Sequence, residues 1–524
     1  MEYVEVPQPA VDPYTTEPTN YVQLLNSIRA AKNLRRLQHL IAEYATRFDA
    51  VHLSAALCRL PHLLRYRDKD LTATGVVLPT HGLRPFVHKP GAKPKDSHAQ
   101  LAAQLAAQLH AMLPAHVNGM YPRQVANGIW ALGSLSKQGV PVPSELVEAL
   151  LSLLKRGNYS LLKVHGEGVD AVQLLKGLAH LQFRDAQLIE TLAAFVLTHV
   201  QQLRPRELQM AAWSLVTLEY KDGGGGGSAG VGAGQVYSAL GRRAAELAVD
   251  FLPQGISTMM WALAKAGVHD PAIMKALADG LQPQLVLVVQ QDVAMVVLAC
   301  TLAGYRAPPL LQLLGDKAAR DLDTYTDLSM ATLLSGFAAL DFLHKPLMDK
   351  VVAKVMAQRE VYARHDVAAK VCQAYARLDQ LDAPSCAMLS RLLASFAGQL
   401  DAVRPYEIAM VCEALAAAPQ LVRALGHETP AVLASIASNR VDGFSPSQLL
   451  CVLQTYNQLG LQQPEMYRSA VAFVKQAWLP EGRLGVDDGV GVLVECCRQG
   501  VLDPDLAKVG GGGGGGGTGQ VREA

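Results

Sequence analysis

The sequence lacks most of the signatures that point to catalysis or to a membrane. Aromatic residues make up 6% of the 524 residues and charged residues 18%, whereas apolar residues reach 50%. No apolar run approaches the ~20 residues that cross a bilayer, so we expect no membrane insertion. The dipeptide Gly-Lys never occurs, which excludes a Walker-type phosphate loop, and no His-Glu-x-x-His motif is present. We therefore expect no enzyme activity, no cofactor and no metal ion.

The remaining chemical motifs are equally weak. The stretch Gly226–Gly230, GGSAG, matches a nucleophile elbow only formally, because it lies in a glycine run without a preceding strand. The eight cysteines form no Cys-x-x-Cys pair and no zinc-like spacing with histidine. Their positions on apolar helix faces predict small core residues in a reducing compartment.

A helical pattern that recurs about every 37 or 38 residues is the most informative feature present. Each copy contains an apolar helix, a break with glycine or an acidic residue, and a second helix that begins near a proline. The last apolar residue before each break marks the copies: Leu135, Leu181, Leu218, Ala266, Ala303, Leu340, Leu378, Ala418 and Leu459. Two longer gaps contain insertions, within Arg156–Gly168 and in the glycine run Gly223–Gly234. Such a period is typical of helical repeats that bury one another's apolar faces.

Prolines and polar residues mark where these helices begin. First helices open at Pro122, Pro205, Pro253, Pro405 and Pro446, where the missing N–H of proline costs nothing. Second helices start near Pro141, Pro271, Pro308, Pro346, Pro384 and Pro464, and Asp185 offers a cap where proline is missing. The sequence therefore predicts an all-α fold, a right-handed α-solenoid of about ten helical hairpins.

The composition also predicts how the chain is divided. We expect a disordered amino terminus over residues 1–18, and an N-terminal helical segment with the first repeat over 19–66. An inserted basic and proline-rich loop follows over 67–97. The repeat array covers 98–500, with the glycine-rich insertion 223–234, and 501–524 form a disordered glycine-rich tail. The acidic amino terminus does not resemble a transit peptide, so either the protein is not imported or its true start lies upstream of Met1.

Positive charge is concentrated in the amino-terminal half. The net charge is +1, yet residues 21–222 contain 23 Lys or Arg and 14 Asp or Glu. Arg59–Lys95 is particularly basic. This asymmetry is compatible with a polyanionic partner and equally with a solvated surface.

Aromatic and basic residues recur just after the first helix of several repeats. The aromatic positions are Phe183, Tyr220, Tyr305 and Phe342, and the basic positions are Arg184, Lys221, Arg306, His269 and His344. Stacked repeats would place these side chains in a row, where cations neutralise phosphates and aromatic rings stack on bases. An ordinary helix ending is the alternative, since a hydrophobe past a C-cap folds back onto its helix and cations favour helix C-termini.

A second polar row occurs in the first turn of the first helices. Its members are Gln124, Asp170, Glu207, Asp292, Glu407 and Gln448. Variable polar residues at one repeat position suit base-by-base reading of RNA. Acidic and amide side chains are also what the first turn of a helix prefers, and we favour that interpretation here.

Several of these repeats resemble the octotricopeptide repeat of green-algal organellar proteins. The resemblance rests on LGSLSKQGVPVPSELVEAL, WALAKAGVHDPAIMKALADGL, LAGYRAPPLLQLL and LGLQQPEMYRSAV, and covers roughly residues 20–500. The opening TNYVQLLNSIRAAKNLRRLQHLIAEYATRF is similar to the helical segment that often precedes such arrays. The wider group includes the Leu-rich region of FAST-kinase-domain and RAP proteins.

This resemblance implies a non-catalytic protein that binds single-stranded RNA of the chloroplast or mitochondrion and supports RNA processing, stability or translation. The RNA-binding residues would be Arg184, Lys221, Arg306, His269, His344, Tyr220 and Tyr305, and other RNA-processing proteins are expected partners. A protein-binding scaffold of the HEAT or armadillo kind is the alternative, which the near-neutral net charge also suits.

Overall fold

The computed structural model describes residues 18–65, 97–157, 159–221, 235–358, 364–426, 428–478 and 486–501. Over these ranges the chain consists of helices and turns without any strand, which confirms the predicted all-α helical-repeat fold. None of the described helices is long and apolar enough to cross a membrane. The chain forms two compact units, Met1–Leu281 (unit 1) and Gln282–Ala524 (unit 2), and each is described by itself.

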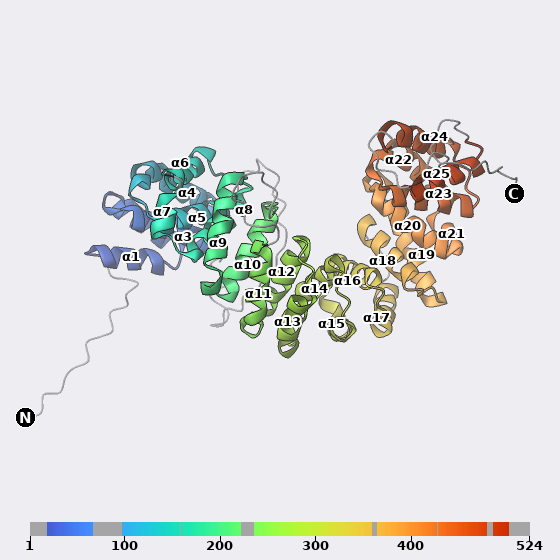
Figure 1. Cartoon of the computed structure of the whole chain (residues 1–524), viewed down its shortest axis with the longest axis horizontal. Helices are drawn as coiled ribbons and strands as arrows, with labels where there is room; N and C mark the ends of the chain where they lie inside the picture. Colours follow the sequence, from blue (N-terminus) through green and yellow to red (C-terminus); the bar gives the residue numbers. More distant parts are fainter. Residues whose placement is uncertain are drawn as a thin grey trace, which may run out of the picture. The chain divides into compact units, whose positions relative to one another are not determined.

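Unit 1 is a series of helical hairpins (Figure 1). Its first helices are α1 (Tyr21–Ala30), α3 (Ala50–Arg65), α5 (Pro122–Lys137), α8 (Gly168–Leu181), α10 (Pro205–Thr217) and α12 (Pro253–Lys265). Its second helices are α2 (Leu34–Tyr44), α4 (Ser97–His116), α6 (Ser144–Lys155), α9 (Ala186–Thr198), α11 (Gln235–Glu246) and α13 (Pro271–Leu281). The short helix α7 (Ser160–His165) occupies the predicted insertion, and 3-10 turns lie at η1 (Ala45–Arg47), η3 (Val117–Gly119), η4 (Val200–Gln202) and η5 (Ala248–Asp250).

Unit 2 repeats the same plan. Its first helices are α14 (Gln290–Ala303), α16 (Asp327–Ala339), α18 (His365–Arg377), α20 (Pro405–Ala417), α23 (Pro446–Gln458) and α25 (Val486–Arg498). The helices between them are α15 (Pro308–Arg320), α17 (Lys345–Met356), α19 (Ala383–Ala397), α21 (Val422–Leu425), α22 (Thr429–Asn439) and α24 (Pro464–Phe473). Its short turns are η6 (Gln282–Gln284), η7 (Leu322–Thr324), η8 (Leu400–Ala402), η9 (Pro419–Leu421), η10 (Val441–Gly443) and the π turn η11 (Val474–Trp478).

Within each unit the first helices pack against one another in chain order, and the second helices form a second layer. The core lies between these layers and is made mainly of leucine, alanine and valine. Cys300, Cys372, Cys412 and Cys496 are buried in it as free thiols. Burial raises the pKa of the Cys300, Cys372 and Cys496 thiols to about 12, so they stay protonated near neutral pH. The core prediction is thus confirmed for these four cysteines, whereas Cys58, Cys386 and Cys451 are half-buried and Cys497 is exposed.

The sequence signals for helix starts largely coincide with the observed ones. All five predicted prolines stand at the first position of α5, α10, α12, α20 and α23. The Asp185 carboxylate accepts a hydrogen bond from the Leu188 amide at 3.0 Å and so caps α9. The amino-terminal stretch differs from a single helix, because Asn33 caps a new helix, α2, after a break at residues 31–33.

Most first helices end in the same way. The first or second residue after the helix adopts a left-handed conformation, and the amide that follows it donates a hydrogen bond to the carbonyl five residues earlier, which defines a Schellman ending. The left-handed residue is glycine in some repeats (Gly139, Gly267, Gly304, Gly460 and Gly500) and Gln182, Glu219, Asp341 or Asp379 in others. α20 is an exception, because Ala418 leads directly into η9.

Close approach of two first helices depends on glycine in the pair α5 and α8. A Cβ atom at Gly177 would lie 2.6 Å from the Ile129 carbonyl carbon and oxygen, and one at Gly133 would lie 2.5 Å from the Gly177 oxygen. Those distances are shorter than any real contact, so any side chain there would force the helices apart.

We expect Gly177→Ala to destabilise the protein by about 1–3 kcal/mol, because the helices must separate to accept the methyl group. The check is the midpoint of urea unfolding followed by circular dichroism. Gly119→Ala is the matched control, since a Cβ atom there meets nothing within 4 Å. Equal midpoints for the two variants would contradict the close packing of α5 and α8.

The helix endings predict stability changes of opposite sign for two substitutions at left-handed residues. Asp379→Gly should stabilise the protein by up to about 1 kcal/mol, because it relieves a left-handed conformation of φ 54° at a non-glycine residue. Gly304→Ala should destabilise it by about 1 kcal/mol for the converse reason, as its φ is 62° and no neighbour obstructs a Cβ atom. Thermal unfolding midpoints of the two variants provide the measurement, and shifts of the same sign would refute the assignment.

Candidate nucleic-acid interface

The aromatic residues after the first helices belong to the helix endings. The amides of Phe183, Tyr220, Tyr305 and Phe342 are the donors of the Schellman hydrogen bonds, at 2.9–3.1 Å. All four side chains are half-buried, and the Phe342 ring packs edge-on against Phe337 of its own helix with centroids 5.5 Å apart. This geometry agrees with the alternative interpretation of these positions as ordinary helix endings, in which the side chain folds back onto its helix.

Two of the basic residues that follow are paired with carboxylates of the next repeat. The Arg184 guanidinium forms a two-pronged ion pair with Glu219, at 2.7 and 2.9 Å. Arg306 donates to the Asp341 carbonyl oxygen at 2.6 Å and lies 3.3 Å from its carboxylate. Glu219 and Asp341 are themselves the left-handed residues of the following helix endings. The predicted basic row therefore contributes to joining neighbouring repeats.

The other basic candidates have different surroundings. Lys221 and His269 are exposed after α10 and α12. His344 differs from the expected exposed row, because its side chain is only 1% exposed. Its Nδ1 atom accepts a hydrogen bond from the Leu347 amide at 3.1 Å and caps α17, while Nε2 faces Asp316 at 3.2 Å. A cap acceptor at Nδ1 assigns the proton to Nε2, so His344 has a structural role.

The second polar row also consists of helix caps. In each of its six members a side-chain oxygen accepts a hydrogen bond from the backbone amide three residues earlier, at 2.8–3.3 Å. Asp170, Glu207, Asp292 and Glu407 are buried in this role. This geometry agrees with the interpretation favoured from the sequence, that these residues belong to helix starts.

The exposed side of the first helices in unit 1 carries a different set of residues. Five positions before the repeat markers lie Trp130, Lys176, Trp213 and Trp261, each half-buried. The Trp130 ring lies beside His62 with centroids 5.4 Å apart, and Trp213 lies beside His180 at 5.5 Å. The sequence analysis missed this row, although the signal was present: three of the four tryptophans fall at one repeat position.

The first helices of the two units carry opposite charge. Those of unit 1 hold eight basic residues, Arg29, Arg59, Arg65, Arg123, Lys137, Lys176, Arg206 and Lys265, and two acidic ones, the buried caps Asp170 and Glu207. Those of unit 2 hold three basic residues, Lys370, Arg377 and Arg498, and eight acidic ones, Asp292, Asp327, Asp366, Glu407, Glu413, Asp487, Asp488 and Glu495. The first-helix layer of unit 1 therefore favours polyanions, and that of unit 2 disfavours them.

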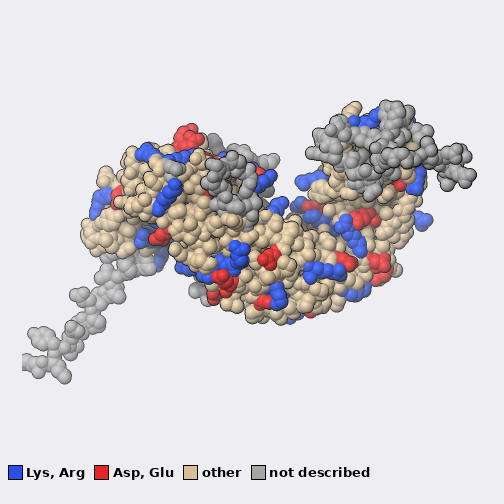
Figure 2. Space-filling model, in the orientation of Figure 1, with Lys and Arg blue, Asp and Glu red and all other residues tan. Residues whose placement is uncertain are grey.

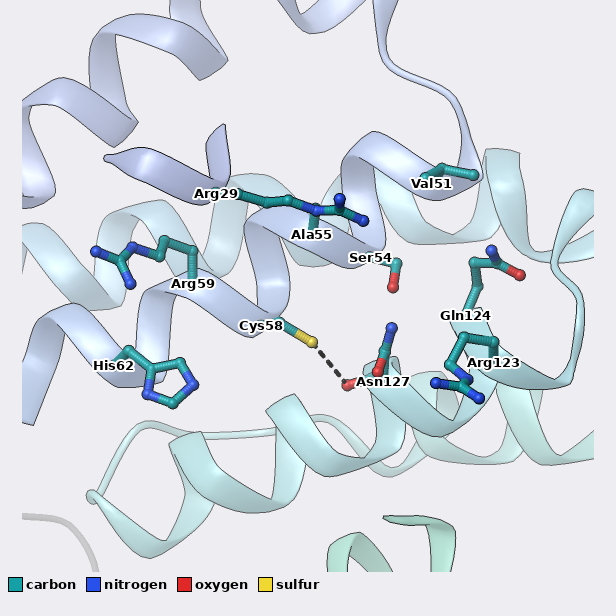
Figure 3. A pocket seen from close by; sticks show the side chains of 10 residues that line it. All are labelled: Arg29, Val51, Ser54, Ala55, Cys58, Arg59, His62, Arg123, Gln124 and Asn127. Atoms are coloured by element: carbon teal, nitrogen blue, oxygen red, sulfur yellow. Dashed lines mark hydrogen bonds between the residues drawn. The ribbon is translucent and has the colours of Figure 1, made fainter. Parts of the chain in front are cut away.

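A pocket of about 340 Å³ opens between α1, α3 and α5 of unit 1 (Figure 3). Its walls include Arg29, Arg59, His62, Arg123 and Asn127, and none of its ten lining residues is acidic. The Arg123 guanidinium contacts Glu167 at 2.6 Å and Asp170, both outside the pocket lining. Most of the second sequence candidate, the basic stretch after Arg59, lies outside the described residues, but Arg59 and His62 are placed in this pocket.

Elsewhere on the surface, basic and acidic side chains are mixed. On the face of each unit drawn in Figure 2, Lys and Arg form separate spots with Asp and Glu between them. Across the described ranges no group of three or more His, Cys, Asp or Glu is arranged to hold a metal ion.

Comparison with known proteins supports an association with RNA. The profile of the family described as RNA-editing substrate-binding complex 6 protein matches residues 170–384. That match and the helical-repeat fold agree with an RNA-associated helical-repeat protein and coarsely support a role in RNA processing. The octotricopeptide assignment stays a prediction.

Other comparisons contribute less. No curated protein matches the chain. Among solved structures, a chain described as a homology model of the full-length AP-3 complex in an intermediate open conformation is similar over 93% of this chain and 90% of its own length. The identity is 11% and the TM-score 0.33, too low to support an argument.

The assignment of His344 predicts a loss of stability on substitution. We expect His344→Ala to cost about 1 kcal/mol or more, because it removes the cap of α17. His269→Ala, at an exposed histidine after α12, should change the free energy of unfolding by less than about 0.5 kcal/mol. Chemical denaturation of the two variants measures this difference, and an unchanged His344→Ala protein would show that the cap is dispensable.

Proposed function

We propose that the protein binds single-stranded RNA along the first-helix layer of unit 1, with no catalysis of its own. Bound RNA would then be protected or presented to other RNA-processing proteins, in support of processing, stability or translation. The observation that carries this proposal is the charge of that layer, in which the acidic side chains are buried as helix caps and most of the basic ones are exposed.

The tryptophan row supports single-stranded rather than duplex RNA. Half-buried rings lie at matching positions on α5, α10 and α12, and each base that stacks on such a ring gains about 1–3 kcal/mol. Duplex RNA keeps its bases stacked internally and displays backbone and grooves instead. Lys176 and Lys265 provide cations for the phosphates between stacked bases.

The residues after the helix endings take a smaller part in this proposal than the sequence alone indicates. Arg184 and Arg306 are half-exposed but paired with carboxylates, so RNA would have to displace Glu219 and Asp341 to use them. Lys221, His269 and Tyr220 are contacts at the rim of this layer in the proposal, whereas Tyr305 belongs to unit 2 and lies outside it. We leave out His344, which is buried.

The compartment is also part of the proposal. An organelle is expected from the octotricopeptide resemblance, and the family match is coarsely consistent with a mitochondrion while giving no support to a chloroplast.

The test is the affinity of purified protein for a randomised single-stranded RNA pool, measured by fluorescence anisotropy. Trp213→Leu and Trp261→Leu keep an apolar side chain but remove the ring, so each should weaken binding by roughly 5- to 100-fold. Lys176→Gln and Lys265→Gln should each reduce the salt dependence, with the slope of log K against log salt falling by about 0.7.

Two controls separate this interface from the predicted basic row. Phe195→Leu removes a half-buried ring from the second helix α9, and Arg306→Gln removes an ion-paired cation from unit 2. Both variants should bind RNA within about twofold of the unaltered chain. If the tryptophan variants bind as tightly as these controls, the proposed interface is wrong. Absence of RNA binding by the unaltered chain would favour the scaffold alternative.

A further inference from the structure

We propose that the pocket between α1, α3 and α5 binds a phosphate monoester, the terminal phosphate of a bound RNA strand. This inference rests on the proposed function and adds a fixed point for one end of the RNA. It draws on three features of the pocket: its charge, a buried hydroxyl without a partner, and its position beside the tryptophan row.

The charge of the lining suits an anion. Arg29 from α1, Arg59 from α3 and Arg123 from α5 all contribute to the walls, and no Asp or Glu does. Cys58 adds no negative charge, because burial raises the pKa of its thiol to about 12. Guanidinium groups bind phosphate through paired hydrogen bonds, so this lining suits a phosphate rather than a metal cation, which would need carboxylates.

A buried hydroxyl group faces the pocket without a partner. Ser54 is 2% exposed, and its Oγ atom has no hydrogen-bond partner among the described residues. Figure 3 shows this hydroxyl directed into the space between α3 and α5, toward Asn127. A buried polar atom left unpaired costs about 1–3 kcal/mol, so a hydrogen bond to a phosphate oxygen would recover free energy that the empty pocket loses.

Arg29 is available on the opposite wall. Within the described ranges its guanidinium makes no hydrogen bond and no ion pair, and its side chain is exposed. Arg59 uses its Nε–H to donate to the Ala31 carbonyl at 2.7 Å, which holds that side chain in place at the pocket wall. One fixed and one free guanidinium can close around an anion with little reorganisation of the fold.

The position of the pocket connects it to the proposed RNA track. His62 lines the pocket and also contacts the Trp130 ring, the first member of the tryptophan row. Asn127, on the other wall, accepts a hydrogen bond from Gln173 of α8 at 2.8 Å. A strand stacked on Trp130 would therefore lie close to His62, which lines the pocket.

A terminal phosphate fits better than an internal one. A monoester carries close to two negative charges near neutral pH, whereas a backbone diester carries one. Arg123 is paired with Glu167 and Asp170. Arg29 and Arg59 add two positive charges to a lining without a carboxylate, and these match the higher charge. The volume of about 340 Å³ lies at the lower end of small-ligand sites, which suits the end of a single strand.

The experiment compares three pools of single-stranded RNA of about 12 nucleotides with the same randomised sequence. One pool has a 5′-phosphate, one a 3′-phosphate, and one hydroxyl groups at both ends. We expect the full-length protein to bind one phosphorylated pool roughly 10- to 100-fold more tightly than the hydroxyl-ended pool. Ser54→Ala should remove this difference and leave the affinity for the hydroxyl-ended pool unchanged. Arg29→Gln should also remove the difference but weaken the binding of all three pools, because Arg29 belongs to the basic first-helix layer as well.

Two controls distinguish a loss of phosphate binding from a loss of folding and from a general loss of positive charge. Arg35→Gln removes an exposed arginine from α2, outside the pocket, and should keep the preference. Ser54→Ala should unfold at the same or a higher urea concentration than the unaltered chain, because it deletes an unpaired buried hydroxyl.

Three outcomes would overturn the inference. Equal affinity for all three pools would refute it while leaving the proposed RNA binding intact. Failure of every pool to bind would refute both. Binding of AMP or inorganic phosphate that Ser54→Ala abolishes, without any preference for phosphorylated RNA ends, would assign the pocket to a small phosphorylated ligand instead.

Discussion

The hydrogen bond that closes most first helices is the interaction on which the repeat depends. In most described repeats the amide that follows the left-handed residue donates to the carbonyl five residues earlier. This bond reverses the chain at a fixed angle and turns the following hydrophobe back onto the helix. Most hairpins therefore begin from the same kind of helix end. The close contact at Gly133 and Gly177 shows how little space separates two neighbouring first helices, α5 and α8.

Helix ends, at both termini, occupy many of the polar side chains that the sequence offers for function. Backbone groups at helix termini need partners, and the side chains nearest to them in the sequence supply those partners. Asp170, Glu207 and Glu407 are buried as caps for this reason, and Glu219 and Asp341 hold arginines of the preceding repeat. A recurrent polar position in a helical repeat is therefore as much a sign of a helix end as of a ligand.

The proposed function rests on the composition of the first-helix layer in unit 1. In unit 1 the first-helix layer retains Lys176, Lys265 and the tryptophan row, while its acidic side chains are buried. In unit 2 the same layer is acidic, so the two units offer different surfaces on the same repeat plan. The pocket with Ser54 and Arg29 lies at the amino-terminal side of this layer and would give a bound strand a defined end.

The sequence by itself determined the helical repeat, its period, and most helix starts, since proline at the first helical position and the apolar spacing act locally. Pro122 and Asp185 stand where they were expected for that reason. Only the tertiary structure decided which polar residues remain available. Arg184 and Glu219 are 35 residues apart, and His344 is buried against Gly315, so neither outcome follows from local sequence. The pocket forms only where α1, α3 and α5 pack together, because each of these helices contributes one of its arginines. A repeat pattern fixes each hairpin, whereas the contacts between hairpins decide which side chains are left for a ligand.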